Sequence, residues 1–224
     1  ELQDFAFVAS HDLQEPLRKI RAFGERLERH AGDLNSAARD DLTRINAAAA
    51  RMQTLIENLL SFSQVNTRGR PFVRVDLNQI VAVVLEDLSE RVLTSQAHLD
   101  VATLPVIDGD PTQLRQVMQN LIGNALKFSA ANRAPLVRIQ WTPAELRGQP
   151  AVAVSVVDNG IGFDQKHQER IFAPFQRLHT TTEYPGTGIG LAIVRRIVQR
   201  HQGRIDAHGQ PGLGATFTLI LPER

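Results

Sequence analysis

Residues 114–128 read LRQVMQNLIGNALKF, and this stretch decides the fold of the second part of the chain. Its apolar residues recur at steps of three and four, which predicts a helix with one face packed on a sheet. The members of that face are Leu114, Met118, Leu121 and Ala125. Asn120, Asn124 and Lys127 fall within about 60° of one another on a second face. Because amide oxygens can coordinate Mg²⁺ and lysine can bind phosphate oxygens, this face is a candidate site for a cation and phosphate; a merely solvated polar face is the alternative.

Further along the chain, VVDNGIG at 156–162 predicts a buried strand that ends in an acid and two glycines. Asp158 can accept a hydrogen bond from an exocyclic amine, and Gly160 and Gly162 let the backbone approach a ligand closely. A strand that ends in Asp-x-Gly is common, so this segment does not identify a site by itself.

The stretch YPGTGIGL at 184–191 leads into a helical pattern at 189–201. Gly186, Gly188 and Gly190 are placed to form a nest of backbone N–H groups at the start of that helix, which favours phosphate. The stretch is neither a Walker A loop nor a dinucleotide-binding fingerprint after a strand. A last segment, GLGATF at 212–217, predicts a hairpin turn with Thr216 at the start of a strand.

Residues 1–66 predict an antiparallel helical hairpin, because apolar residues recur at three- and four-residue steps on both sides of a polar break at 32–36. Either Asn35 or Ser36 can cap the second helix. Its seam is a heptad, made of Ala38, Leu42, Ile45, Ala49, Met52, Ile56 and Leu59. Two helices leave such a seam partly exposed to water, so we expect a four-helix dimer; packing on the rest of the same chain is the alternative.

The first helix carries Ser10, His11 and Asp12, followed by Pro16. Consecutive helical residues point about 100° apart, so these three side chains cannot form a hydrolase triad. An imidazole beside a carboxylate is instead a candidate nucleophile. Pro16 has no N–H to donate to the carbonyl of Asp12, so a bend after His11 is expected.

Residues 67–75 are interpreted as a linker, and residues 76–224 as an α/β sandwich whose mixed sheet carries helices on one face. Helices are predicted at about 76–95, 110–128 and 189–201. Strands are predicted at 72–75, 98–102, 136–142, 151–157, 203–208 and 215–221.

The composition excludes several functional classes. The net charge is +1, which gives no electrostatic basis for binding nucleic acid or an anionic membrane. The chain has no cysteine, so disulfides and thiolate metal sites are excluded. No apolar run reaches the roughly 20 residues of a membrane span, and no membrane contact is expected. The helical pattern is already running at Glu1, so we interpret the chain as a piece of a longer protein.

The order of these motifs resembles the N, G1, G2 and G3 boxes of the ATP-binding domain of histidine kinases. The segment Ile171–Phe175 is similar to the F box of that domain. The helical hairpin with His11 resembles the dimerisation and phosphoacceptor domain of the same family. Within the family, the stretches SHDLQEPL at 10–17 and FQRLH at 175–179 look most like the output module of bacterial phytochromes.

The resemblance implies a cytoplasmic kinase that uses ATP and Mg²⁺, forms a homodimer through residues 1–66 and serves a sensor domain that precedes this piece. His11 is then the phosphoacceptor, with Asp12 orienting its ring, and the partner is the receiver domain of a response regulator. Asn124 is the metal ligand. The nucleotide-binding residues implied are Asn120, Asn124, Lys127, Asp158, Gly160, Gly162, Gly186, Gly188, Gly190 and Thr216.

Two positions depart from the family pattern. Many relatives have Thr or Asn four residues after the histidine, where it orients water for dephosphorylating the partner; here Glu15 takes that place, with Gln14 beside it. The short lid has Thr180–Thr182 where relatives often carry a basic residue. A response-regulator phosphatase and a non-catalytic dimerising pseudokinase therefore stay as alternatives. Steady ATP hydrolysis of the gyrase kind is disfavoured, because it needs a glutamate where this chain has Asn120.

Overall fold

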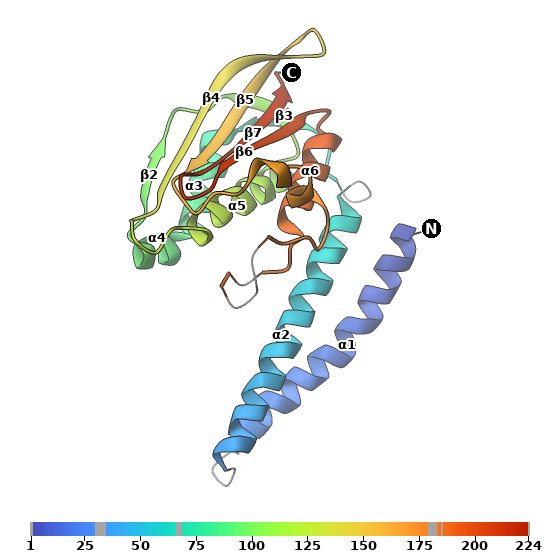
Figure 1. The fold of residues 1–224 in the computed structure, drawn as a ribbon. Helices are drawn as coiled ribbons and strands as arrows, with labels where there is room; N and C mark the ends of the chain where they lie inside the picture. Colours follow the sequence, from blue (N-terminus) through green and yellow to red (C-terminus); the bar gives the residue numbers. More distant parts are fainter. Residues whose placement is uncertain (1, 30–34, 66–68, 179–182, 185, 224) are drawn as a thin grey trace. The chain divides into compact units, whose positions relative to one another are not determined.

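The computed structural model describes residues 2–29, 35–65, 69–178, 183–184 and 186–223, and of residues 2–13, 15 and 29 it describes only the backbone. The chain divides into two compact units, Glu1–Thr67 and Arg68–Arg224. The first unit contains two long helices, and the second contains a sheet with helices against it (Figure 1). This confirms the predicted fold class, a helical hairpin followed by an α/β sandwich.

The hairpin consists of α1 (Leu2–Arg29) and α2 (Ser36–Gln64). The side chain of Asn35 accepts a hydrogen bond of 2.8 Å from the backbone N–H of Ala38, so Asn35 and not Ser36 caps α2. The helix α1 continues through Pro16. Between the helices, Leu17 of α1 packs in a buried cluster with Ala49 and Ile56 of α2.

The heptad seam of α2 divides into two rows. Leu42, Ala49 and Ile56 are buried, whereas Ile45 and Met52 are 53% and 49% exposed. The described part of α1 also leaves apolar side chains exposed, namely Ile20, Phe23 and Leu27. One hairpin thus covers one row of its seam and leaves a second apolar row open to another surface.

The second unit is built on a five-stranded sheet with the order β2-β4-β5-β7-β6. Its strands are β2 (His98–Val101), β4 (Leu136–Leu146), β5 (Gln149–Asp158), β6 (Arg204–Gln210) and β7 (Gly214–Pro222). The pair β2–β4 is parallel and the other neighbours are antiparallel. A separate antiparallel pair joins β1 (Val73–Asp76) to β3 (Val106–Gly109).

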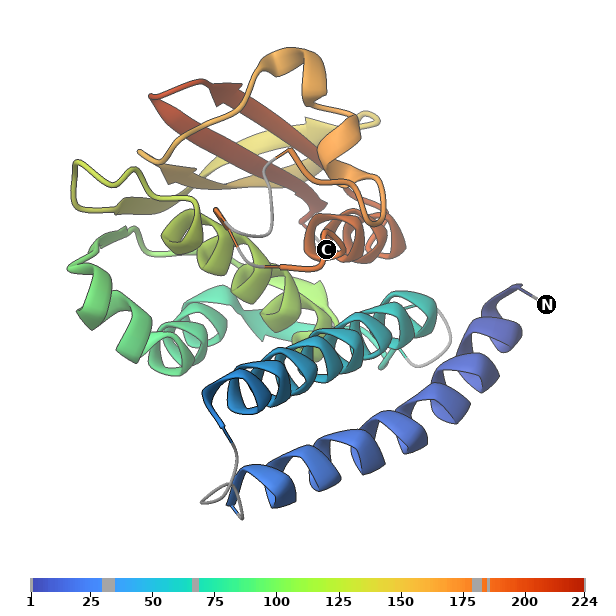
Figure 2. The same cartoon turned by 60° about the horizontal axis from the view of Figure 1, so that its bottom comes forward.

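Helices α5 (Pro111–Lys127) and α6 (Gly190–Arg200) lie on the same face of this sheet (Figures 1 and 2). The predicted apolar face of α5 is confirmed, since its four members are all buried. The remaining helical elements are α3 (Leu77–Asp87), α4 (Ser89–Ser95) and the short 3-10 helices η2 (Gln165–His167) and η3 (Arg170–Phe172).

Three elements differ from the prediction. The helix expected at 76–95 is two helices, because the backbone leaves the helical region at Leu88. The strand β3 was not predicted, because its sequence VIDG places two apolar residues side by side before an acid and a glycine and so shows no alternation. The strand β4 runs past Pro143, which is tolerated because β2 pairs with β4 only as far as Ile139 and leaves one edge of β4 open beyond it.

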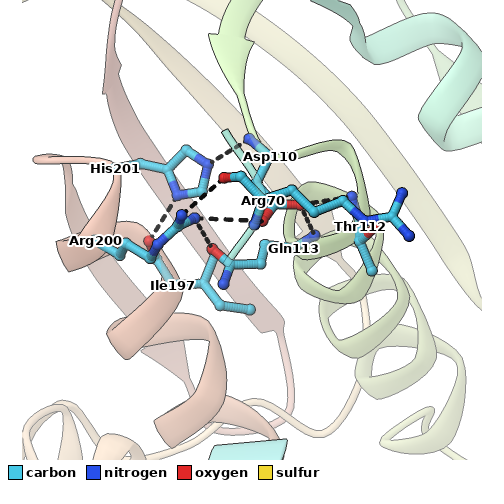
Figure 3. A network of polar contacts seen from close by, with 7 residues as sticks. All are labelled: Arg70, Asp110, Thr112, Gln113, Ile197, Arg200 and His201. Carbon is cyan, nitrogen blue, oxygen red and sulfur yellow. Dashed lines mark hydrogen bonds and ion pairs between the residues drawn. The ribbon is translucent and has the colours of Figure 1, made fainter. Parts of the chain in front are cut away.

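Asp110 joins the start of α5 to the end of α6 and to residue 70 (Figure 3). Its side chain is 1% exposed. Oδ1 caps α5 by accepting the backbone N–H groups of Thr112 and Gln113, at 3.0 and 3.2 Å. Oδ2 accepts the backbone N–H of Arg70 at 2.6 Å and the guanidinium of Arg200 at 3.3 Å. One buried carboxylate thus accepts four hydrogen bonds from three segments.

His201 completes this cluster. Its Nε2 accepts the backbone N–H of Asp110 at 3.1 Å, so Nδ1 carries the proton and donates to the carbonyl of Ile197 at 2.8 Å. The ring of Phe72 stacks on it with centroids 4.5 Å apart. Burial lowers the pKa of His201, which keeps the ring neutral as this geometry requires.

Replacing Asp110 with alanine is expected to lower the free energy of unfolding by about 3 kcal/mol, because the Arg200 charge and two N–H groups of α5 lose their partner. Urea denaturation of the full chain measures the change. The control is Asp100→Ala, which removes an exposed pair with Arg138 and should cost less than about 1 kcal/mol. Equal losses in the two variants would contradict this role for Asp110.

Candidate functional site

Asp158 is the last residue of β5, where it pairs in register with Ala215 of β7. Its Oδ1 accepts the backbone N–H of Gly160 at 2.8 Å and that of Ala215 at 3.2 Å. Among the described residues these bonds all go to Oδ1, which leaves Oδ2 for a ligand. Burial raises the pKa of Asp158, and the two backbone N–H groups and the nearby charge of Arg133 oppose that rise.

The glycines after Asp158 lie where side chains would not fit. A Cβ at Gly160 would overlap the backbone carbonyl of Phe128. Gly162 has φ +62°, and a Cβ there would overlap the carbonyl of Gln210. Because neither glycine has a side chain, the loop after β5 packs closely against the end of α5 and against β6. Both glycines therefore shape the surface next to Asp158.

The polar face of α5 meets the glycine loop that leads into α6. The amide of Asn120 donates to the carbonyl of Gln116 at 2.8 Å, and a Cβ at Gly190 would lie 2.5 Å from its Oδ1. A Cβ at Gly186 would lie 2.6 Å from Nζ of Lys127. Lys127 thus lies beside the first of the three predicted loop glycines and Asn120 beside the last, with Asn124 between them on the same helix.

Lys127 is partly buried and lies close to an aromatic ring and to two other cationic side chains. Its Nζ lies 4.4 Å from the centroid of the Phe128 ring. Burial lowers the pKa of Lys127, and the nearby charges of Arg177 and Arg91 lower it further. Three cations in this region create a positive potential, which suits a polyanionic ligand.

Arg177 orders the loop before α6. It donates to the carbonyl of Gly186 at 2.9 Å and to that of Tyr184 at 2.6 Å. The backbone N–H of Phe175 donates to the carbonyl of Gly188 at 3.0 Å, and Gly188 has φ +76°. The segment similar to an F box therefore contacts the predicted glycine loop through a main-chain hydrogen bond of Phe175, and Arg177 holds the loop by its side chain. His179 and Thr180–Thr182 lie outside the described residues.

The end of α5 is joined directly to the Asp158 loop. The carbonyl of Phe128 accepts the backbone N–H of Ile161 at 2.9 Å. Thr216 is the neighbour of Ala215 on β7 and pairs in register with Val157. By this register Thr216 lies on the face of the sheet opposite to Asp158 and Ala215. The other predicted residues of the second unit gather where the end of β5, the polar face of α5 and the loop before α6 meet.

His11, Asp12 and Glu15 lie in α1, but the structure describes only their backbone and not their side chains. Two features of the second unit escaped prediction. Arg133 contacts the carbonyls of Gly160 and Gly212, and no local pattern indicates contacts over such sequence distances. Asp110 was also missed, although Asp-Pro before a helical pattern is a helix-start signal that predicts its cap.

Comparisons with known proteins place these features in a family. The family model of the histidine kinase-, DNA gyrase B- and HSP90-like ATPases matches residues 109–224. The model of the His Kinase A (phospho-acceptor) domain matches residues 1–68. Among the described residues, no helix has the length and apolar run that a membrane crossing requires.

Curated relatives and solved structures agree with this match. The phytochrome-like protein Cph1 of Synechocystis sp. is 40% identical over 99% of this chain, and cyanobacterial phytochrome A of Nostoc sp. is 41% identical over 99%. The chain spans only 29% and 28% of those two proteins. The structure of full-length ShkA in complex with AMPPNP matches with a TM-score of 0.74 and 27% identity, over 98% of this chain and 45% of that one.

Replacing Gly162 with alanine is expected to lower the free energy of unfolding by at least about 2 kcal/mol, because positive φ and the overlap with Gln210 both oppose a Cβ. Chemical denaturation measures it. Gly148 is the matched control: it has φ +74° with nothing within 4 Å, so Gly148→Ala should cost only about 1 kcal/mol. If Gly148→Ala costs as much, close packing at Gly162 is not the cause.

Proposed function

Because this chain belongs to the sensor histidine kinases and is most like their phytochrome-type members, we propose that it transfers the γ-phosphoryl group of ATP to His11 and from there to an aspartate of a response regulator. The observation that supports this most is the single surface on which Asp158, the polar face of α5 and the glycine loop before α6 meet. We assign residues 1–66 to dimerisation and phosphotransfer and residues 76–224 to ATP binding, joined by 67–75.

We propose that the adenine base of ATP is bound by the carboxylate of Asp158. Its carboxylate is half-enclosed, held by two backbone N–H groups, and has an oxygen to accept the exocyclic amine. Gly160 and Gly162 bring the backbone close to the base, whereas Thr216 pairs with Val157 and lies on the opposite face of the sheet.

The phosphates are assigned to the positive region between α5 and the glycine loop. Lys127 and Arg177 supply the charge, and Gly186, Gly188 and Gly190 present backbone N–H groups at the start of α6. We propose that Mg²⁺ is held by the amide oxygen of Asn124 and by the phosphates, with Asn120 in support, because amide oxygens suit this hard cation and both residues lie on the polar face of α5. When bound, Mg²⁺ would neutralise charge on the phosphates.

In the transfer step, a ring nitrogen of His11 attacks the γ-phosphorus and the bond to the β-phosphate oxygen breaks, so ADP leaves. Asp12 accepts the N–H of the other ring nitrogen and orients the imidazole. In the second step a carboxylate oxygen of the response regulator attacks the same phosphorus, and the N–P bond breaks. Phosphoryl transfer depends mainly on positioning and charge neutralisation, which is what the surface around α5 supplies.

The hairpin supports a homodimer. The row with Ile45 and Met52 and the exposed side chains of α1, such as Phe23, are apolar and uncovered within one hairpin. A second hairpin placed against them would complete a four-helix bundle of the usual kind.

Incubating the full chain with γ-labelled ATP and Mg²⁺ is expected to give an acid-labile label. His11→Ala should reduce the label to background, because the accepting nitrogen is lost. The control is His98→Ala, which alters an exposed histidine of β2 and should label like the wild type. Label retained by His11→Ala would contradict the proposal.

A chase with a receiver domain separates the alternatives. Transfer of label to the receiver supports the kinase. Removal of phosphate from a pre-phosphorylated receiver by a chain that does not label itself would show a phosphatase instead, and neither activity would show a pseudokinase.

A further inference from the structure

Arg133 lies in the connection between α5 and β4 and bridges two distant segments. Its Nη2 donates to the carbonyl of Gly160 at 2.9 Å and to the carbonyl of Gly212 at 2.8 Å. Gly160 follows Asp158 at the end of β5, whereas Gly212 lies in the turn between β6 and β7. A single nitrogen therefore joins the two segments that flank the end of β5.

These two segments are the ones that hold the Asp158 carboxylate. Gly160 donates its N–H to Oδ1 from one side, and Ala215, three residues after Gly212, donates from the other. The segments also meet directly, since the N–H of Gly212 donates to the carbonyl of Ile161 at 2.7 Å. With Arg133 in place, the two donors of Asp158 are fixed relative to each other.

The charge of Arg133 acts in the same direction as its hydrogen bonds. The guanidinium lowers the pKa of Asp158 and so opposes the effect of burial. An ionised carboxylate accepts hydrogen bonds only, and hydrogen bonds to charged groups are stronger than neutral ones. Arg133 thus favours both the position and the ionised form that an amine-binding carboxylate requires.

We propose that Arg133 is a positioning residue for adenine recognition: by joining Gly160 to Gly212 it fixes the Asp158 carboxylate that accepts the amine of the base. This inference rests on the proposed role of Asp158. Arg133 acts through the backbone carbonyls of Gly160 and Gly212. Its removal is therefore expected to weaken the binding energy that the amine of the base contributes, and to leave the binding energy from the phosphates unchanged.

The test compares the affinities of the full chain for Mg-ATP and for the Mg complex of purine riboside triphosphate, which lacks the exocyclic amine. Arg133→Ala should weaken ATP binding about tenfold and leave the affinity for the analogue within about twofold, because the analogue does not use Asp158. Arg133→Lys should recover most of the ATP affinity, since one nitrogen makes both bonds. The matched control is Arg204→Ala, an exposed arginine at the far end of β6, which should change neither affinity.

The variant Asp158→Asn tests the proposed adenine contact of Asp158 separately from the positioning role of Arg133. If Asp158→Asn keeps the wild-type preference for ATP over the analogue, the assignment of adenine to Asp158 is wrong. If Asp158→Asn loses that preference but Arg133→Ala keeps it, the positioning role of Arg133 is wrong. Equal loss of both ligands in Arg133→Ala also overturns it, because that pattern indicates general damage to the fold.

Discussion

The buried carboxylate of Asp110 is the interaction on which the candidate nucleotide-binding surface depends. It fixes the first turn of α5 to the last turn of α6 through Arg200, and His201 accepts a hydrogen bond from its backbone (Figure 3). The two helices run in opposite directions, so the other end of α6 lies beside the middle of α5, where Gly190 meets Asn120. Fastening the helices at one end sets the distance between the amide face and the glycine loop at the other.

The same cluster includes the segment that precedes β1. The N–H of Arg70 donates to Asp110, its carbonyl accepts from Arg200 at 2.8 Å, and Phe72 stacks on His201. Residues 70–72 are therefore fixed to the two helices that carry the candidate phosphate site. Within the second unit, Asp110 therefore anchors both the segment at residues 70–72 and the two helices of the candidate nucleotide-binding surface.

Local pattern predicted the elements that carry the chemistry, because α5 and α6 are amphipathic and β5 is a long apolar strand that ends at Asp158. The heptad of α2 also predicted the hairpin, but periodicity does not say which of two apolar rows a single partner helix covers. Contacts between residues far apart in the sequence could not be predicted from local pattern. Arg133 and Gly212 are 79 positions apart and Arg200 and Asp110 are 90 apart, so only the folded sheet brings them together.

We propose that ATP binds where the end of β5, the polar face of α5 and the loop before α6 meet. Backbone amide resonances of the full chain, followed by NMR during titration with Mg-ATP, test this most directly. The account predicts that the largest shifts fall on Gly160, Gly162 and Gly188 and on α5 from Asn120 to Lys127, with small shifts near His201. Shifts centred on the Asp110 cluster, or none in the loop after Asp158, would contradict it.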